Sequence, residues 1–243
     1  MSNPILRQNF ENEVVLDGEP MSINGAIQKS LLLTTIIIIS AIYTVGLVLT
    51  GFTDKATILG VSGLIISAVA GFVIVLARPK ISNILAIIYS IGEGFALGLI
   101  SAYYETQYHG IVLNAIFSTF ATMFAMLALY RFRIIRCDEK FRSVIFTATA
   151  SIAIIYLIQI VASFFGRGIP QIFTASPFGI GFSIIVVLIA AFNFIVDFDF
   201  IENGEKLMLP KLYEWIGAVS LMFSLVWLYL EILRLLFKLN SRR

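Results

Sequence analysis

Charged residues are scarce in this sequence of 243 residues: Asp, Glu, Lys and Arg make up 13%, and hydrophobic residues make up 59%. A soluble domain carries about 25% charged residues. With 21 Phe and a surplus of Ile and Leu, the chain has too little polar surface to cover a globule in water. We therefore expect lipid to be its solvent, and we do not expect an enzyme of the soluble type.

Cysteine and histidine are almost absent, with one residue of each. The single Cys137 excludes a disulfide framework and a multi-cysteine metal cluster, and the single His109 excludes a histidine-based metal centre. Any metal site would therefore use oxygen ligands, which suit hard cations such as calcium, and no cofactor is expected. The net charge of +2 is small, so nucleic acid is not an expected partner.

Long apolar runs dominate what is present. A membrane-spanning helix needs roughly 20 mostly apolar residues, and segments rich in proline, glycine or basic residues separate the runs. The sequence therefore predicts an all-α membrane protein, a bundle of seven transmembrane helices in a lipid bilayer. Seven stretches qualify: 31–51, 56–77, 81–103, 111–130, 144–165, 177–196 and 213–237.

The two ends of the chain differ from the apolar centre. The N-terminal segment is mildly acidic and lacks the apolar region that follows a basic start in a signal peptide. We interpret residues 1–29 as a flexible tail, residues 30–238 as the transmembrane domain and residues 239–243 as a basic C-terminal tail.

Lysine and arginine in the short connections indicate the orientation, because basic residues favour the cytoplasmic side. Eleven of the 17 fall on the side of the N-terminus, which we therefore expect to be cytoplasmic. The C-terminal tail would lie outside under a strict count of seven spans. It would lie inside if the last segment were re-entrant, and the sequence leaves both possibilities open.

Glu93 lies about 12 residues into the third run, close to mid-bilayer at a rise of ~1.5 Å per residue. An ionisable side chain at this depth costs ~2.5–3.5 kcal/mol on insertion scales, so its presence needs a reason. One interpretation is a protonated acid that only hydrogen-bonds a neighbouring helix. The other is a role in transport or gating. Gly94 and Gly98, four residues apart, would allow close helix packing here.

Glu231 lies in the last run, with Arg234 three residues later on the same helix face. A local ion pair between the two would lower the cost of both charges. Alternatively, Glu231 faces the bundle interior as a ligand for a proton or a cation.

Asp197 and Asp199 follow the sixth run and point about 200° apart on a helix. The helix macrodipole disfavours acids at a C-terminal end, so a compensating partner is expected. Arg78 is the candidate, because it ends the second run on the same side of the membrane. The alternative is that both aspartates are merely solvated.

Three motifs in a fixed order resemble the Bax-inhibitor family of membrane proteins, in its bacterial branch. They are GEGFALGLISAYYE in the third run, DFDFIENG after the sixth, and EWIGAVSLMFSLVWLYLEILRLL in the last. The order and spacing of the seven runs agree as well, so the resemblance covers roughly residues 25–240.

The resemblance implies a seven-helix fold with the last helix near the centre, in the inner (cytoplasmic) membrane. It also implies a pH-sensitive calcium-leak channel, in which two acids share one basic partner. Carried over to this chain, Asp197 and Glu231 are the acids and Arg78 is the partner. The two acids are then the candidate calcium ligands, and calcium is the transported ion rather than a cofactor.

Helix direction bears on whether these acids can meet. The sixth and seventh runs are antiparallel, so acids near both C-terminal ends should lie on opposite membrane faces. Asp197 and Glu231 could share a site only if the last helix started near Gly217 or beyond.

Three functions remain open from the sequence. The first is a leak channel gated by protonation of Asp197 and Glu231, with Asp199 and Glu93 as further ion-binding candidates. The second is a non-conducting regulator that binds other membrane proteins, for example a quality-control protease. The third is a proton-coupled carrier that uses Glu93 and Glu231 as proton sites.

Overall fold

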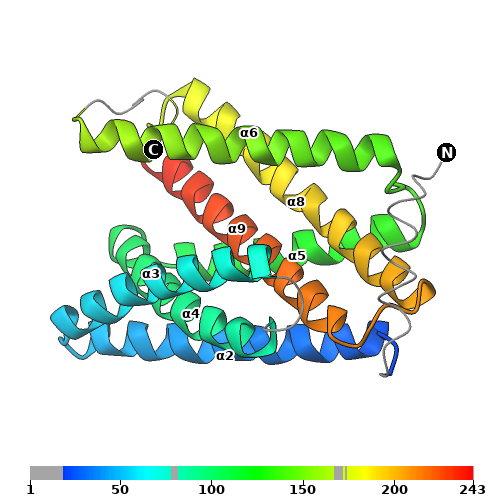
Figure 1. The fold of residues 1–243 in the computed structure, drawn as a ribbon. Helices are drawn as coiled ribbons and strands as arrows, with labels where there is room; N and C mark the ends of the chain where they lie inside the picture. Colours follow the sequence, from blue (N-terminus) through cyan, green and yellow to red (C-terminus); the bar gives the residue numbers. More distant parts are fainter. Residues whose placement is uncertain (1–18, 78–81, 167–171, 173, 243) are drawn as a thin grey trace. The chain divides into compact units, whose positions relative to one another are not determined.

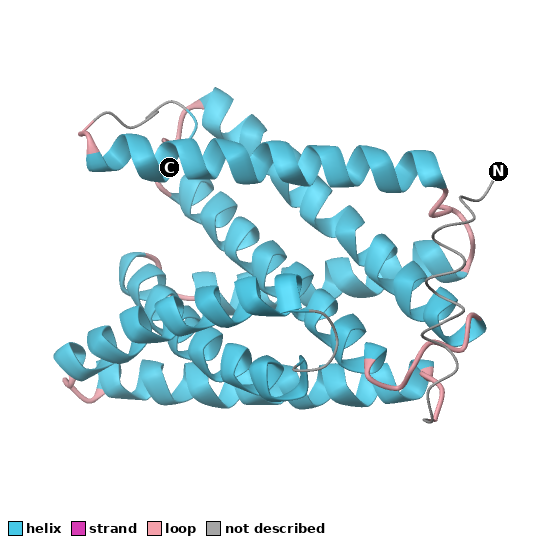
Figure 2. Cartoon of the chain, viewed as in Figure 1, coloured by secondary structure: helices cyan, strands magenta, loops and turns pink. Residues whose placement is uncertain are grey.

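A computed structural model describes residues 19–77, 82–166, 172 and 174–242. The described chain is helical and contains no strand (Figure 2). All seven of its helices are long and apolar enough to cross a membrane, which confirms the expected fold class. In chain order they are α2 (Ile23–Leu49), α3 (Thr53–Ala77), α4 (Ser82–Gln107), α5 (Ile111–Arg131), α6 (Glu139–Phe164), α8 (Pro177–Lys206) and α9 (Tyr213–Asn240) (Figure 1).

Two helix boundaries differ from the sequence expectation by more than five residues. Helix α2 begins at Ile23, so residues 23–29 belong to a helix and not to a tail. Its start is fixed by Ser22, whose side chain accepts a hydrogen bond from the backbone N–H of Gly25 at 3.0 Å. Helix α8 runs to Lys206, ten residues beyond the end of the sixth apolar run. Asp197 therefore lies within a helix and not at its end.

The chain forms two compact units, and both are discontinuous in sequence. Unit 1 comprises Met1–Ile100 and Asp199–Met222. Unit 2 comprises Ser101–Phe198 and Phe223–Arg243. Helices α4, α8 and α9 each contribute residues to both units.

Close contacts at glycine hold α2, α3 and α4 together within unit 1 (Figure 1). A Cβ atom on Gly94 would lie 2.6 Å from the Ile37 carbonyl oxygen, and one on Gly98 would lie 2.5 Å from that of Ala41. No side chain fits at either position, so the backbones of α4 and α2 are in direct contact. The glycine spacing noted in the third run thus has a packing role.

Aromatic side chains fill much of unit 2. Phe194 is fully buried on α8 and stacks on Phe198, with ring centroids 6.1 Å apart. Phe198 in turn lies 6.2 Å from the ring of Tyr130 on α5. These contacts fix the helix that carries Asp197 against its neighbour.

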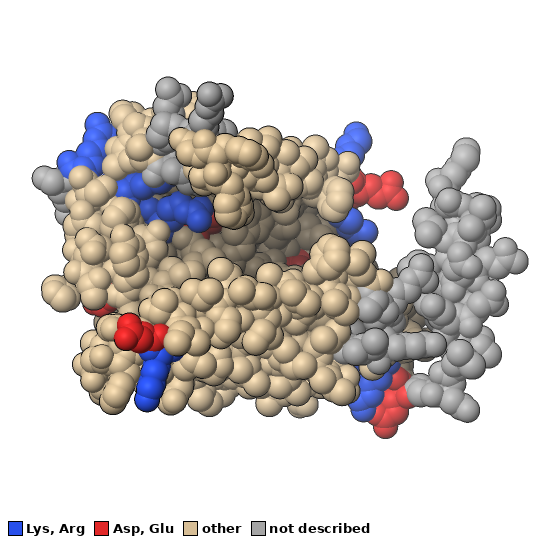
Figure 3. All heavy atoms as spheres, turned by 60° about the vertical axis from the view of Figure 1, so that its left-hand side comes forward, with Lys and Arg blue, Asp and Glu red and all other residues tan. Residues whose placement is uncertain are grey.

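Large apolar side chains are exposed along the helices, which is what a lipid environment requires. Leu49, Phe146 and Phe164 are 81%, 74% and 84% exposed. Figure 3 shows a face that is mostly uncharged, with charged side chains confined to a few groups. Helix α9 is the most buried of the described helices: 67% of its most apolar stretch is buried, against 11% for α6.

Candidate functional site

Asp197 is a buried acid on α8 that reaches across to α9. Only 6% of the residue is exposed, and its carboxylate accepts a hydrogen bond from the Ser224 hydroxyl. A buried carboxylate needs such donors, because the loss of hydration is otherwise uncompensated. The bond joins the two antiparallel helices of unit 2 at the middle of α9.

Asp199 lies two residues further along α8 and is bound differently. It is also buried, and its Oδ2 accepts a hydrogen bond at 2.9 Å from the amide of Asn203, one turn later on the same helix. Both aspartates are therefore buried, one bonded by a side chain of a neighbouring helix and the other by a side chain of its own helix.

Glu231 is the centre of a second cluster in unit 2. It is 1% exposed and forms an ion pair with Arg234, with Nη1 2.9 Å from Oε1. The Tyr156 hydroxyl on α6 donates to the same carboxylate at 2.8 Å, and Arg234 also bonds that hydroxyl at 2.7 Å. The local Glu–Arg pair expected from the sequence is thus present, and a tyrosine from another helix completes it.

The two acids lie at different positions along α9: Glu231 is part of this helix, and Asp197 bonds it at Ser224. Ser224, the partner of Asp197, stands seven residues before Glu231, which is about 10.5 Å along a helix. The hydrogen bonds described for the two carboxylates go to different side chains. Arg78, the shared partner expected from the sequence, lies outside the described residues.

Glu93 lies on α4 in unit 1 and belongs to neither of these two clusters. Its neighbour Gly92 packs against Ser67 on α3, because a Cβ atom on Gly92 would lie 3.1 Å from the Ser67 backbone nitrogen. Ser67 and the nearby Tyr89 are both buried. A hydrogen bond from this acid to a neighbouring helix stays a prediction, and so does its role in transport.

Glu214 was missed by the sequence reasoning, although it is as buried as Glu231. It lies in the first turn of α9 and forms an ion pair with Lys29 on α2. The backbone N–H and the hydroxyl of Ser22 donate to it at 2.9 and 3.1 Å. The first residue of the third motif was the available signal, because an acid in the first turn of a helix also suits the macrodipole.

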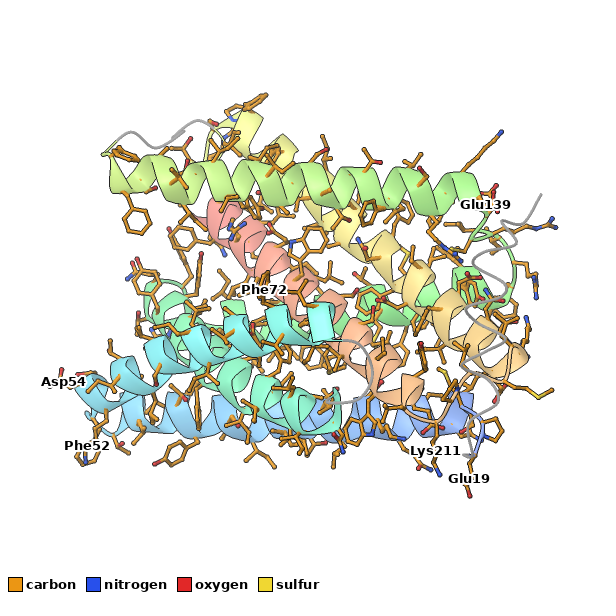
Figure 4. The ribbon with its side chains drawn as sticks, in the orientation of Figure 1. Glu19, Phe52, Asp54, Phe72, Glu139 and Lys211 are labelled. Carbon is orange, nitrogen blue, oxygen red and sulfur yellow. The ribbon has the colours of Figure 1, made fainter. Side chains whose placement is uncertain are left out.

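The segment before α2 is paired with the α8–α9 connection. The Met21 N–H donates to the Leu209 carbonyl at 2.7 Å, and the Lys211 N–H donates to that of Glu19 at 3.1 Å. The Glu19 and Lys211 side chains form an ion pair, which lowers the pKa of Glu19 and raises that of Lys211. Figure 4 shows this pair at the end of α2 opposite Asp54. We call residues 19–22, 209–211 and 214 the N-terminal clasp.

Lys238, in the last turn of α9, is a second buried charge that sequence reasoning missed. It is 3% exposed. Its ammonium donates to the carbonyl oxygens of Ile172 and Gly179 at 2.7 and 3.0 Å and to the Ser183 hydroxyl at 2.8 Å. No sequence signal separates it from Arg242, an exposed basic residue of the C-terminal tail.

Metal-binding capacity is limited in the part of the chain that the structure describes. No group of three or more His, Cys, Asp or Glu side chains gathers there in a way that could hold an ion. Calcium sites typically use six to eight oxygen ligands, with several carboxylates. Asp197 and Glu231 alone would supply only part of such a shell.

Comparison with known proteins identifies the family. No curated protein matches the chain. The model of the family described as Bax inhibitor 1 like matches residues 3–241, nearly the whole length. The match agrees with the three sequence motifs and with the seven apolar helices. The chain therefore belongs to the Bax inhibitor 1-like family of helical membrane proteins.

Proposed function

We propose that this multi-pass membrane protein is a pH-sensitive cation leak channel, that calcium is the transported ion, and that carboxylate protonation gates it. The observation that carries the proposal is the hydrogen bond between Asp197 on α8 and Ser224 on α9. It places an ionisable group at a contact between two membrane-spanning helices, where its charge state decides how strongly they are joined.

The gating step follows from the chemistry of that contact. An ionised carboxylate only accepts hydrogen bonds and binds a hydroxyl donor strongly, since charge-assisted bonds are roughly twice as strong as neutral ones. A protonated carboxyl carries no charge, so its bond to Ser224 is weaker. Protonation therefore loosens α8 from α9, and the leak increases as the pH falls.

Glu231 has a different part in this scheme. Arg234 forms an ion pair with its carboxylate and Tyr156 donates a hydrogen bond to it. Glu231 therefore keeps α9 attached to α6 while Asp197 titrates. Carboxylates along the path would attract cations, and Glu93 on α4 would serve the same purpose in unit 1.

Calcium flux into liposomes that contain the purified protein, measured across pH, tests the proposal. We expect Asp197→Asn to raise the leak at neutral pH and to flatten its pH dependence. Asp54→Asn is the matched control, because Asp54 is an exposed acid at the start of α3. Equal flux in the wild type, Asp197→Asn and Glu231→Gln at every pH would refute gating by these acids.

A second candidate is a non-conducting regulator that binds other membrane proteins, such as a quality-control protease. The complete local pairing of Glu231 with Arg234 and Tyr156 favours it, because a purely structural acid would be bound in this way. Under this function liposomes show no protein-dependent flux at any pH.

We also propose a cytoplasmic N-terminus in the inner membrane, on the basis of the basic connections. Reporter fusions placed after each helix test the orientation. A reporter that is active outside the cell when it is fused before α2 would reverse it.

A further inference from the structure

The Lys238 ammonium is buried among neutral oxygens. An ammonium has three donors, and each has one acceptor here: two backbone carbonyls and one hydroxyl. None of these acceptors carries a negative charge. Burying a charge in this way is costly unless every donor is satisfied, so the three oxygens are what keep the ammonium in place.

The charged side chains that the structure describes along α9 do not explain the placement. Arg234 lies one turn before Lys238 on α9 and is itself a cation. Glu231, the nearest acid along the helix, is already paired with Arg234. Gly179 lies in the first turn of α8, where the macrodipole disfavours cations. The attraction must therefore come from the oxygen atoms themselves.

Neutral oxygens at this spacing are the ligands of dehydrated monovalent cations. Ion filters use rings of backbone carbonyls to replace the hydration shell of such an ion. Calcium prefers more ligands and several carboxylates, which this position lacks. The ammonium thus stands where a small monovalent cation would stand.

We propose that the Ile172 carbonyl, the Gly179 carbonyl and the Ser183 hydroxyl form a monovalent-cation site, and that Lys238 fills it as a tethered cation. The side chain joins the end of α9 to the start of α8 and excludes free cations from this part of unit 2. Removing the Lys238 side-chain amine leaves the site open to free ammonium, methylammonium, potassium or sodium ions. Only the expected effect of Lys238 on ion leak rests on the proposed function. The site itself does not.

Chemical rescue tests the site without any measurement of transport. Purified full-length Lys238→Ala is heated in chloride salts of methylammonium, ammonium, potassium, sodium or choline at equal ionic strength. We expect its melting temperature to be lowest in choline. A small cation should recover at least about half of the loss, because a ligand that binds only the folded state stabilises it by mass action.

Three comparisons make the result specific. The wild type and Lys140→Ala, which changes an exposed lysine at the start of α6, should melt equally in all five salts. Lys238→Ala/Ser183→Ala should show a smaller recovery than Lys238→Ala. If Lys238→Ala does not fold, Lys238→Met takes its place in every comparison, because methionine keeps most of the side-chain volume without the charge.

Two results would overturn the site: equal melting of Lys238→Ala in choline and in every small cation, or a recovery that Ser183→Ala does not reduce. The consequence is measured separately, as potassium leak from liposomes, which we expect Lys238→Ala to raise severalfold over wild type. Rescue by cations without any potassium leak in either protein would keep the site and refute its effect on leak, whereas the calcium-flux assay separately tests the proposed channel.

Discussion

The Ser224 hydroxyl on α9 donates a hydrogen bond to the buried carboxylate of Asp197 on α8. Both helices cross the membrane, so this bond links two spans at a group that can lose its charge. Asp199, two residues later on α8, accepts a hydrogen bond from Asn203 of its own helix.

Replacing Ser224 with alanine tests that bond from the donor side. We expect Ser224→Ala to raise calcium leak at neutral pH and to have little effect in acid, where Asp197 needs the donor less. The measurement is flux into liposomes across pH. Thr57→Ala is the control, because the Thr57 hydroxyl bonds a carbonyl of its own helix. An equal effect of Ser224→Ala at all pH values would contradict the prediction.

The Glu231–Arg234 pair should be strongly coupled energetically. Removing one partner of a buried pair leaves an uncompensated charge and costs about 3–5 kcal/mol. We therefore expect Glu231→Leu and Arg234→Met each to destabilise the protein by that amount, and the double variant to lose far less than the sum. Denaturant unfolding in detergent measures all four proteins. Additive losses would show that the pair is not coupled.

Gly25 should tolerate no side chain. A Cβ atom there would overlap the Glu214 carboxylate, which is fixed by Lys29 and Ser22. We expect Gly25→Ala to cost about 1–3 kcal/mol of stability, as overpacking does. Gly46 lies on the same helix with no atom within 4 Å of its Cβ position. Gly46→Ala should instead stabilise by about 0.5–1 kcal/mol. Similar melting temperatures for the two variants would refute the packing argument.

The Glu19–Lys211 contact should depend on pH at both extremes. Lys211 lowers the pKa of Glu19 below its ordinary value of 4.5, so this contribution is complete above that value and is lost as the pH falls through the lowered one. Glu19 raises the pKa of Lys211 above 10.5, so that contribution is lost as the pH rises through the raised value. We expect the N-terminal clasp to be tightest at neutral pH.

Hydrogen exchange at the Met21 and Lys211 amides measures the clasp, relative to the intrinsic rate at each pH. Lys211→Met should speed exchange at neutral pH and remove the change in acid. Lys206→Met is the control, because Lys206 pairs with Glu202 on its own helix. Unchanged protection of Met21 in Lys211→Met would show that the backbone bonds alone hold the segment.

The helices were predictable because hydropathy over twenty residues is a strong local signal. The helix ends were not. The sixth run stops at Val196 by hydropathy, but α8 continues because Asn203 bonds Asp199 and Lys206 pairs with Glu202 along the same helix. Such short-range polar bonds add helical turns outside an apolar window.

The site was predictable only where its partners are close in sequence. The spacing of Glu231 and Arg234 indicated their pair directly. The partners of Asp197 and Glu214 come from segments 27 and 185–192 residues away, so no local pattern identifies them. The burial of Lys238 could not be predicted for the same reason, since its three oxygen acceptors come from the start of α8 and from Ile172 before it.

The N-terminal clasp has a consequence for biosynthesis. The partners of Glu19, Met21 and Lys29 all lie near the start of α9 or just before it. A ribosome makes that region only after the six described helices that precede α9. Lys29 on α2 therefore has no Glu214 to pair with until nearly the whole chain has been translated. A chain that stops before the start of α9 would leave this lysine without its carboxylate.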